Sequence, residues 1–305
     1  MQQSDPTTPR VQHTERLGWR LKLPETPVRL DDARLLEYRH PSELPMLFLS
    51  LVVFGSLLVG VVVLKHKLIL LGIVGVWFAM ILTSIQAVTY NMLRGAEVTA
   101  TQFPAIFQII QELSQRFQAP RTRVFVVRRL GFQAEVLGFR APYAIVLPSS
   151  LLDSVEPDQL RYVLGRALGQ IRFGHTRMAI LLGGDDATLP GIFSWAAGAR
   201  NLVFAGYRLA QVLSADRAGI LAIGIRAAIE FQIKVSVGNS QAREVRVDDL
   251  IDQAVELARG LSRLHAWLII LQSATPPLIY RLQAMMEWAG RPLREPGINS
   301  DRATD

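Results

Sequence analysis

Residues 45–64 read PMLFLSLVVFGSLLVGVVVL, and residues 68–90 read LILLGIVGVWFAMILTSIQAVTY. Neither stretch contains a charged side chain, and only Lys65, His66 and Lys67 separate them. Each matches the ~20 residues that an α-helix needs to cross the core of a bilayer. A helix of this length without a charge is unusual inside a soluble protein. The two stretches therefore predict a transmembrane hairpin, with both ends of the chain on the same side of the membrane.

Composition narrows the class of protein and the chemistry open to it. The chain has 305 residues, of which half are hydrophobic and 19% are charged, with a formal net charge of +7. These values exclude a collagen, a coiled-coil rod and a mainly disordered chain. The chain contains no cysteine. Disulfides, thiol catalysis, iron–sulfur clusters and cysteine-ligated zinc are therefore excluded.

The hairpin divides the chain into four segments. Residues 1–43 form a polar N-terminal segment with a short amphipathic helix expected over 28–43, and the hairpin occupies 44–90. A larger domain is expected over 94–290, followed by a flexible tail over 291–305. Four arginines lie near the two ends of the hairpin, whereas the short loop between its helices has two lysines. Positive charge is usually more frequent on the cytoplasmic side, so we expect the N-terminus and the large domain in the cytoplasm. These arginines are Arg29, Arg34, Arg39 and Arg94.

The domain is expected to be mainly helical, with a small sheet. Short β-branched and aromatic runs, bounded by proline or charge, predict strands over 123–127 and 143–147. Helical periodicity, with proline near several helix starts, predicts the longer elements. These expected helices cover 104–117, 156–182, 201–223, 247–264 and 278–289.

The order of several segments resembles the membrane-anchored M48 zinc metallopeptidases, the HtpX-like family. After the hairpin come QFPAIFQIIQELSQRF (102–117), VFVV (124–127), QAEVLGF (133–139), AIVLPSSLLDSVEPDQLRYVLGRALGQIRFGH (144–175), LSADRAGILA (213–222) and TPPLIYRLQAMMEWA (275–289). The resemblance implies a zincin-like α+β domain behind a membrane hairpin. It also implies a bacterial inner membrane or another energy-transducing membrane as the location.

The residues that carry the family's chemistry are replaced in this chain. The family binds zinc through two His of an HExxH helix, with the Glu as general base. The matching positions here hold Arg166, Ala167 and Gln170. The third ligand of the family, a Glu, is matched by Val212. Alanine and valine have no donor atom, and an arginine carries a fixed positive charge that repels a metal cation. We therefore expect no metal and no other cofactor.

Other site positions of the family are kept in part. Asp216 stands at the position that supports the third ligand, and Arg281 is in register with the family's last helix. Pro276 stands where the family often has a His near the reacting carbonyl. A buried Asp216 without a metal would need a new positive partner. Two readings of Arg166 are open: it pairs with Asp216, or it points to solvent in a widened groove. Arg166 and Gln170 are expected to face Val212 where the two helices cross.

Two functions are compatible with this sequence. The first is an inactive M48 homologue, or pseudoprotease, that acts as a protein-binding scaffold, assembly factor or accessory subunit of a membrane complex. The second is an active membrane metallopeptidase with an unrecognised, non-standard site. The family holds peptides by adding a strand to a sheet edge. We expect that edge here to be Tyr143, Ala144, Ile145, Val146 and Leu147.

Binding of nucleic acid is not expected. Basic residues cluster around the first predicted strand, but few aromatic residues accompany them and no nucleic-acid motif is present. A solvated basic face, or one that touches anionic headgroups, explains them equally well. These residues are Arg121, Arg123, Arg128, Arg129 and Arg140.

Overall fold

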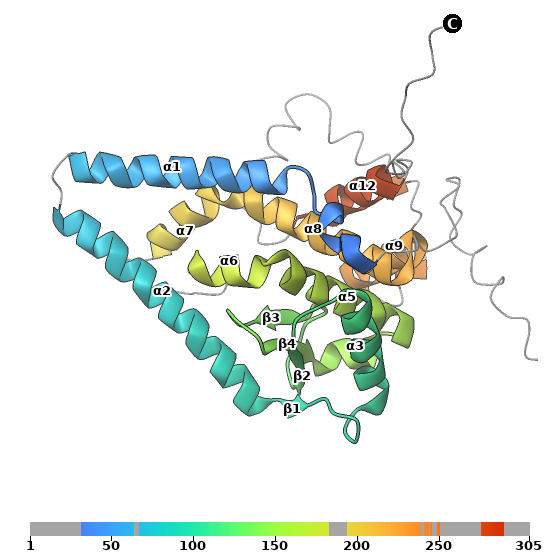
Figure 1. Cartoon of the computed structure of the whole chain (residues 1–305). Coiled ribbons are helices and arrows are strands. Elements are labelled where there is room, and N and C mark those ends of the chain that lie inside the picture. Colours follow the sequence, from blue (N-terminus) through green and yellow to red (C-terminus); the bar gives the residue numbers. More distant parts are fainter. Residues whose placement is uncertain are drawn as a thin grey trace, which may run out of the picture.

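The computed structural model describes residues 32–63, 67–182, 194–238, 241–243, 245, 249–250 and 276–289. Within these ranges the protein is mainly helical and carries one small mixed sheet, as expected for an α+β fold (Figure 1). Three predicted features lie outside the described residues. They are residues 1–31 of the polar N-terminal segment 1–43, nearly all of the predicted helix 247–264 and the tail 291–305.

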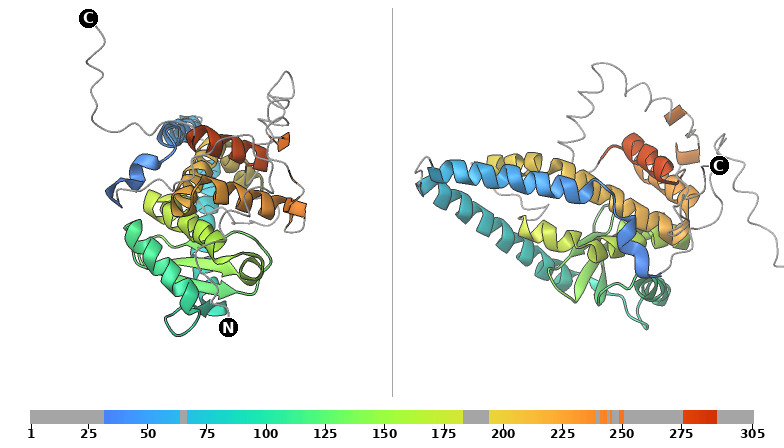
Figure 2. Two further views of the ribbon diagram at one scale, coloured as in Figure 1. Left: turned by 90° about the vertical axis from the view of Figure 1, so that its right-hand side faces the viewer. Right: turned by 45° about the horizontal axis from the view of Figure 1, so that its top comes forward.

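The chain enters the described part through a short 3₁₀ helix, η2 (Asp32–Tyr38), in place of the predicted amphipathic α-helix over 28–43. Two long helices follow, α1 (Glu43–Val63) and α2 (Lys67–Arg94), which meet at one tip and diverge (Figures 1 and 2). Among the described residues, only α1 is long and apolar enough to cross a membrane, because the apolar section of α2, Leu70–Thr83, is shorter. One candidate span is therefore found where the sequence predicted two.

The sheet contains β1 (Ala96–Glu97), β2 (Thr122–Val127), β3 (Glu135–Leu137) and β4 (Tyr143–Pro148), in the order β1-β2-β4-β3. Strands β2 and β4 are parallel, and the two short outer strands are antiparallel to their neighbours.

The prediction that residues 143–147 form the sheet edge is wrong. Strand β4 pairs with β2 on one side and with β3 on the other, and every residue of β4 is buried. An uninterrupted apolar run such as YAIVL is typical of a strand that is covered on both faces. The edge on this side is β3, which lies within the segment QAEVLGF.

Helices α3 (Pro104–Arg116), α4 (Ser149–Ser154), α5 (Pro157–Phe173) and α6 (His175–Leu181) surround the sheet region. The helix predicted over 156–182 is divided into α5 and α6. The division falls at Gly174, whose φ of 81° lies in the left-handed region that favours glycine. Helix α5 begins with a capping box, in which the side chains of Glu156 and Gln159 satisfy each other's backbone N–H groups.

The rest of the described chain is helical: α7 (Ser194–Val203), α8 (Ala205–Ile223), α9 (Ile225–Val237), η4 (Gln241–Arg243) and α12 (Leu278–Ala289). The helix predicted over 201–223 is interrupted at Phe204, which separates α7 from α8. Helix α9 was not predicted as a separate element. It begins after Gly224, whose φ is 90°.

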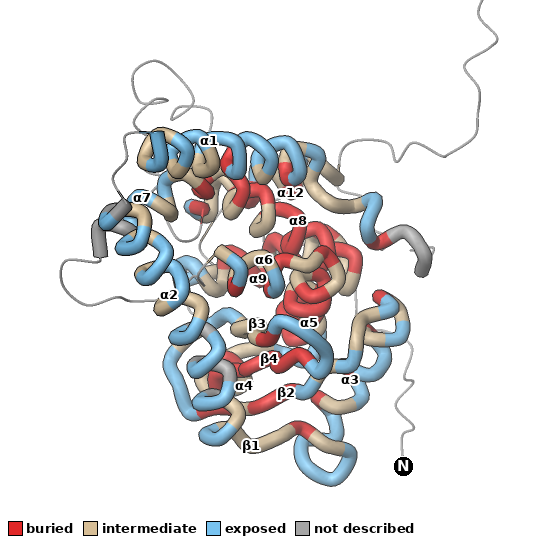
Figure 3. Tube along the Cα trace, turned by 60° about the vertical axis from the view of Figure 1, so that its left-hand side comes forward, coloured by how far each residue is buried: buried red, intermediate tan, exposed pale blue. Residues whose placement is uncertain are grey.

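Helix α5 occupies the centre of the domain. It lies between the sheet on one side and α8 and α9 on the other, and α12 covers the far side of that second layer (Figures 1 and 2). Figure 3 shows that the buried residues gather along α5, α8 and the two central strands. Two charged side chains of this interior, from α8 and α12, mark the site described next.

Candidate functional site

Small residues let α5 and α8 cross with almost no space between their backbones. A Cβ atom added at Gly169 would lie 2.3 Å from Cβ of Ala218, and one at Gly219 would lie 2.5 Å from the ring of Tyr162. Gly165 is similarly confined. The predicted packing of these two segments against each other is thus confirmed. This close crossing brings the side chains at positions 166 and 216 within reach of each other.

Asp216 is the centre of a buried polar cluster, and only 1% of its surface is exposed. Arg281 of α12 donates two hydrogen bonds to its carboxylate, at 2.8 Å from Nε and 2.6 Å from Nη2. The hydroxyl of Tyr162 donates a third, at 3.1 Å, and accepts one from the Gln232 amide at 2.7 Å. Nε of Arg166 lies 2.8 Å from Oδ1. We call these five residues the Asp216 cluster.

The predicted pairing of Arg166 with Asp216 is confirmed, and the reading in which Arg166 points to solvent is wrong. The Arg166 side chain is 12% exposed. Its Nε–H group has no hydrogen-bond partner, although Oδ1 is close. Arg166 therefore acts on Asp216 mainly through its charge. Of the two guanidinium groups, Arg281 makes the hydrogen bonds to the carboxylate, because its planar fork matches the two oxygens.

The electrostatics of the cluster keep the carboxylate ionised. Burial by itself raises the pKa of Asp216, but the charges of Arg281 and Arg166 outweigh it, so that the pKa lies below its usual value. Burial, together with the charge of Asp216, raises the pKa of Tyr162, so its hydroxyl stays protonated and can donate. Among these five residues, two positive charges face one negative charge.

The residues of this site do not fit a zinc ion. The carboxylate of Asp216 already accepts three hydrogen bonds and faces a second guanidinium. The nearest arginines cannot give up their protons to become ligands. Ala167 and Val212, at two of the matched positions, offer no donor atom. The arrangement instead suits a permanent ionic clamp that joins α5, α8 and α12.

The structure brings together three of the residues singled out in the sequence, Arg166, Asp216 and Arg281. Ala167 and Pro276 are buried, while Gln170 and Val212 are half-buried on α5 and α8. That Arg166 and Gln170 face Val212 remains a prediction. Other members of the cluster were missed. Tyr162 stands four residues before Arg166 on one helix face, a spacing that could have indicated it.

A second polar cluster, also missed, joins α1 to the domain. Glu43, 1% exposed, lies at the start of α1, where its Oε1 is 2.9 Å from Nε2 of His175. The Ser214 hydroxyl donates to the other carboxylate oxygen, and Nε of Arg39 lies 3.5 Å from Oε1. Ser214 also accepts the backbone N–H of His40 at 2.9 Å. We call Glu43, His175, Ser214 and Arg39 the Glu43 cluster.

Each cluster includes one residue of α8, Ser214 in one and Asp216 in the other. Because these two residues are two positions apart, they point to different sides of the helix. One side of α8 binds the first residue of α1, and the other binds α5 and α12. The signal for Glu43 was its place as the last acidic residue before the apolar run of residues 45–64.

A scan against protein-family models found no match, and a search of curated proteins found none either. The resemblance to the M48 family therefore rests on the sequence segments themselves.

Proposed function

We propose that this chain is a membrane-anchored homologue of the M48 peptidases that binds a protein partner without cutting it. It would act as a scaffold, an assembly factor or an accessory subunit of a membrane complex. The observation that carries this proposal is Arg166, which stands at the position of the first zinc ligand and lies 2.8 Å from Asp216.

The Asp216 cluster supports this role through its chemistry. Breaking a buried ion pair to admit a cation leaves an uncompensated charge, which costs ~3–5 kcal/mol. A metallopeptidase needs the opposite arrangement, with three ligands, an open coordination position and a general base. A site closed by two arginines holds three helices in place, as a rigid binding module requires.

The membrane anchor is supported by the surface of α1. Eleven of its large apolar side chains are exposed, and within the described residues no charged side chain follows Glu43 on this helix. Contact with lipid chains explains this surface better than contact with water does. We propose that α2 crosses the bilayer as well, that the domain lies in the cytoplasm, and that the membrane is a bacterial inner or energy-transducing one.

Strand β3 is the place where we propose that a partner segment binds. It is the outer strand of the sheet on the side of α5, it is only half-buried, and it pairs with β4 through its other edge. An outer strand presents unpaired backbone groups that an extended peptide can use. The partner would be an extended tail or loop of another membrane protein.

Gentle detergent purification from the native membrane, followed by mass spectrometry for metals and proteins, tests the proposal. We expect a stoichiometric protein partner and no stoichiometric zinc. Stoichiometric zinc would refute the reading of the site and would reopen the peptidase hypothesis.

The binding site can be tested separately. A photo-crosslinking amino acid at Val136 in β3 should capture the partner, whereas the same probe at Arg161, on the surface of α5, should not. Arg161 is a suitable control because it pairs with Glu112 at the surface. Equal capture at both positions would remove β3 from the proposal.

A further inference from the structure

Residues 128–132, at the start of the connection from β2 to β3, form a loop that exposes two large apolar side chains. Leu130 is 91% exposed and Phe132 is 43% exposed. The backbone of this loop is nevertheless tied to α4, because the Ser150 hydroxyl accepts the Gly131 N–H at 3.0 Å and donates to its carbonyl at 2.9 Å. The loop therefore presents its apolar side chains on a fixed support.

The end of α2 lies beside this loop. Strand β1 follows α2 and runs antiparallel to β2, with Ala96 opposite Val126, so the last residues of α2 are placed next to the start of the loop. Helix α2 also contacts β2 and β4. In its last two turns, Leu93 is 81% exposed and Tyr90 is 52% exposed. Exposed apolar side chains from two distant parts of the sequence thus gather at one end of the sheet.

Basic side chains accompany these apolar ones. Arg94 at the end of α2 and Arg128 at the start of the loop are both exposed. The Arg94 guanidinium lies 4.4 Å from the centre of the Tyr90 ring, within the range of a cation–π contact. Tyrosine and arginine at the end of an apolar helix are typical of the interface between bilayer and water.

The acidic side chains of β1 and β3 do not cancel this charge. Glu97 pairs with Arg123, and Glu135 pairs with Arg129, each at 2.7 Å. The two arginines at the end of α2 and the start of the loop are additional to these pairs. They give this end of the sheet a positive charge that complements an anionic surface.

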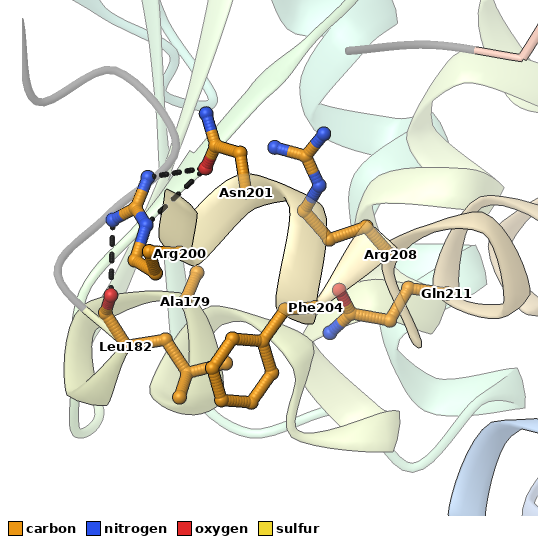
Figure 4. Close-up of a pocket in the computed structure, with 7 residues that line it drawn as sticks. All are labelled: Ala179, Leu182, Arg200, Asn201, Phe204, Arg208 and Gln211. Atoms are coloured by element: carbon orange, nitrogen blue, oxygen red, sulfur yellow. Dashed lines mark hydrogen bonds between the residues drawn. The ribbon is translucent and has the colours of Figure 1, made fainter. Parts of the chain in front are cut away.

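Another arginine near the membrane helices is bound to the protein itself. In the pocket between α6 and the α7–α8 segment, Nη1 of Arg200 donates to the Leu182 carbonyl at 2.9 Å (Figure 4). Its Nη2 donates to Oδ1 of Asn201 at 2.7 Å. These contacts hold Arg200 to the wall of the pocket, whereas the exposed Arg128 can reach a partner outside the domain.

We propose that the end of α2 and the 128–132 loop together form a surface that rests on the anionic headgroups of the bilayer. Its arginines face the lipid phosphates, and its apolar side chains enter the layer between the headgroups and the first acyl carbons. This contact holds the sheet against the membrane and fixes the direction in which β3 faces. The residues of this lipid-facing surface are Tyr90, Leu93, Arg94, Arg128, Leu130 and Phe132.

This inference rests on the proposed membrane anchoring, and its test separates the two. Because the chain contains no cysteine, one introduced cysteine can carry an environment-sensitive fluorophore as the only label. The labelled positions are Leu130→Cys in the loop, Val53→Cys in α1 and Gln111→Cys as a control. Gln111 is exposed on α3, away from the tip where α1 and α2 meet (Figure 1).

The full chain is reconstituted into nanodiscs of phosphatidylcholine, with or without phosphatidylglycerol. Separate samples contain lipids that are spin-labelled near the headgroup or near the end of the acyl chain. With phosphatidylglycerol present, the label at 130 should be quenched by the shallow spin label and the label at 53 by the deep one. The label at 111 should be quenched by neither.

Charge variants test the choice of lipid. Arg94→Gln with Arg128→Gln should lower the ratio of bilayer-bound to free loop by about 5- to 30-fold, read from the blue-shifted and unshifted emission of the label at 130. The control, Arg121→Gln with Arg140→Gln, removes the same charge from exposed positions at the opposite end of β2 and β4 and should leave the ratio unchanged.

Quenching at 53 without quenching at 130 would overturn the inference and leave the anchor standing. Equal quenching at 130 with and without phosphatidylglycerol, or in the native chain and the Arg94/Arg128 variant, would also overturn it. A label at 130 that is shielded in native membranes but not in nanodiscs would assign the surface to a protein partner instead. Absence of quenching at both 53 and 130 would refute the anchor and the inference together.

Discussion

Arg281 and Asp216 stand 65 positions apart in the sequence, yet the Arg281 guanidinium donates two hydrogen bonds, of 2.8 and 2.6 Å, to the Asp216 carboxylate. Both side chains are buried, at 7% and 1% exposed. The pair fastens α12 to α8 at the place where the M48 resemblance puts support for a metal ligand. A buried ion pair between two helices predicts that the stability of the domain depends on Arg281.

Replacing Arg281 by Met should therefore strongly destabilise the domain. The change keeps most of the side-chain volume but leaves Asp216 with only one nearby guanidinium, and breaking a buried pair costs ~3–5 kcal/mol. Chemical denaturation in detergent measures the loss. Gln283→Met on the same helix is the control, because Gln283 is exposed and donates a hydrogen bond to Glu287 within α12. A similar small effect for both variants would contradict a structural role for the pair.

Asp216 should also make stability depend on acid pH. The arginines lower the pKa of Asp216 in the folded state, so its contribution is fully present above the unfolded value of about 3.9. That contribution is lost as the pH falls through the lower, folded-state pKa. Unfolding measured from pH 7 down to pH 3 should give a steeper fall for the native chain than for Asp216→Asn. Parallel curves would show that this carboxylate is not held ionised.

Local signals in the sequence located most elements, and tertiary pairing explains what they missed. The bounds 278–289 of the last helix agree with α12, and both predicted strands are present. Each of the two long helices predicted over 156–182 and 201–223 is interrupted at a single residue, Gly174 and Phe204 respectively. The apolar pattern of each predicted helix continues past that residue and so does not reveal the interruption. The place of β4 in the sheet depends on β3, a strand of three residues that is too short to show periodicity.

The sequence predicted only the contact of the candidate site in which a buried charge needs a partner of opposite charge. Arg166 and Asp216 could be paired because a buried carboxylate without a metal needs a cation. Tyr162, Gln232 and the Glu43 cluster could not be found in this way. Their contacts join helices whose relative placement depends on the close crossing at Gly169, which no local pattern reveals.

That crossing predicts a steric effect. Gly169→Ala would place a Cβ atom 2.3 Å from Cβ of Ala218, so the helices must separate, at a cost of about 1–3 kcal/mol. Adding Ala218→Gly should recover part of the lost stability by making room. The control is Gly198→Ala in α7, where a new Cβ meets no atom within 4 Å and should be neutral or slightly stabilising. A tolerated Gly169→Ala would mean that the helices are farther apart than described.

The Glu43 cluster should couple the membrane helix to the domain. Glu43→Gln removes the charge that faces His175 and Arg39, and a hydrogen bond to a charged group contributes about 1.5–3 kcal/mol. We expect a lower melting temperature and faster proteolysis near residue 40. Glu37→Gln is the matched control, since Glu37 is exposed on η2. If both variants melt and are cleaved alike, α1 is not fastened to the domain through Glu43.

The apolar character of α1 should be required for its insertion into the membrane. Val53 lies near the middle of α1 and is 42% exposed. Val53→Arg would place a charge at the centre of the span, at a cost of about 2.5–3.5 kcal/mol on insertion scales. A topology reporter fused after position 66 should then move from the far side of the membrane to the cytoplasm. Leu130→Arg changes a side chain that is 91% exposed outside α1 and should leave the reporter where it was. If the reporter is cytoplasmic in the native chain, α1 does not cross the membrane. Its apolar side chains would then lie on the domain surface and not in the bilayer.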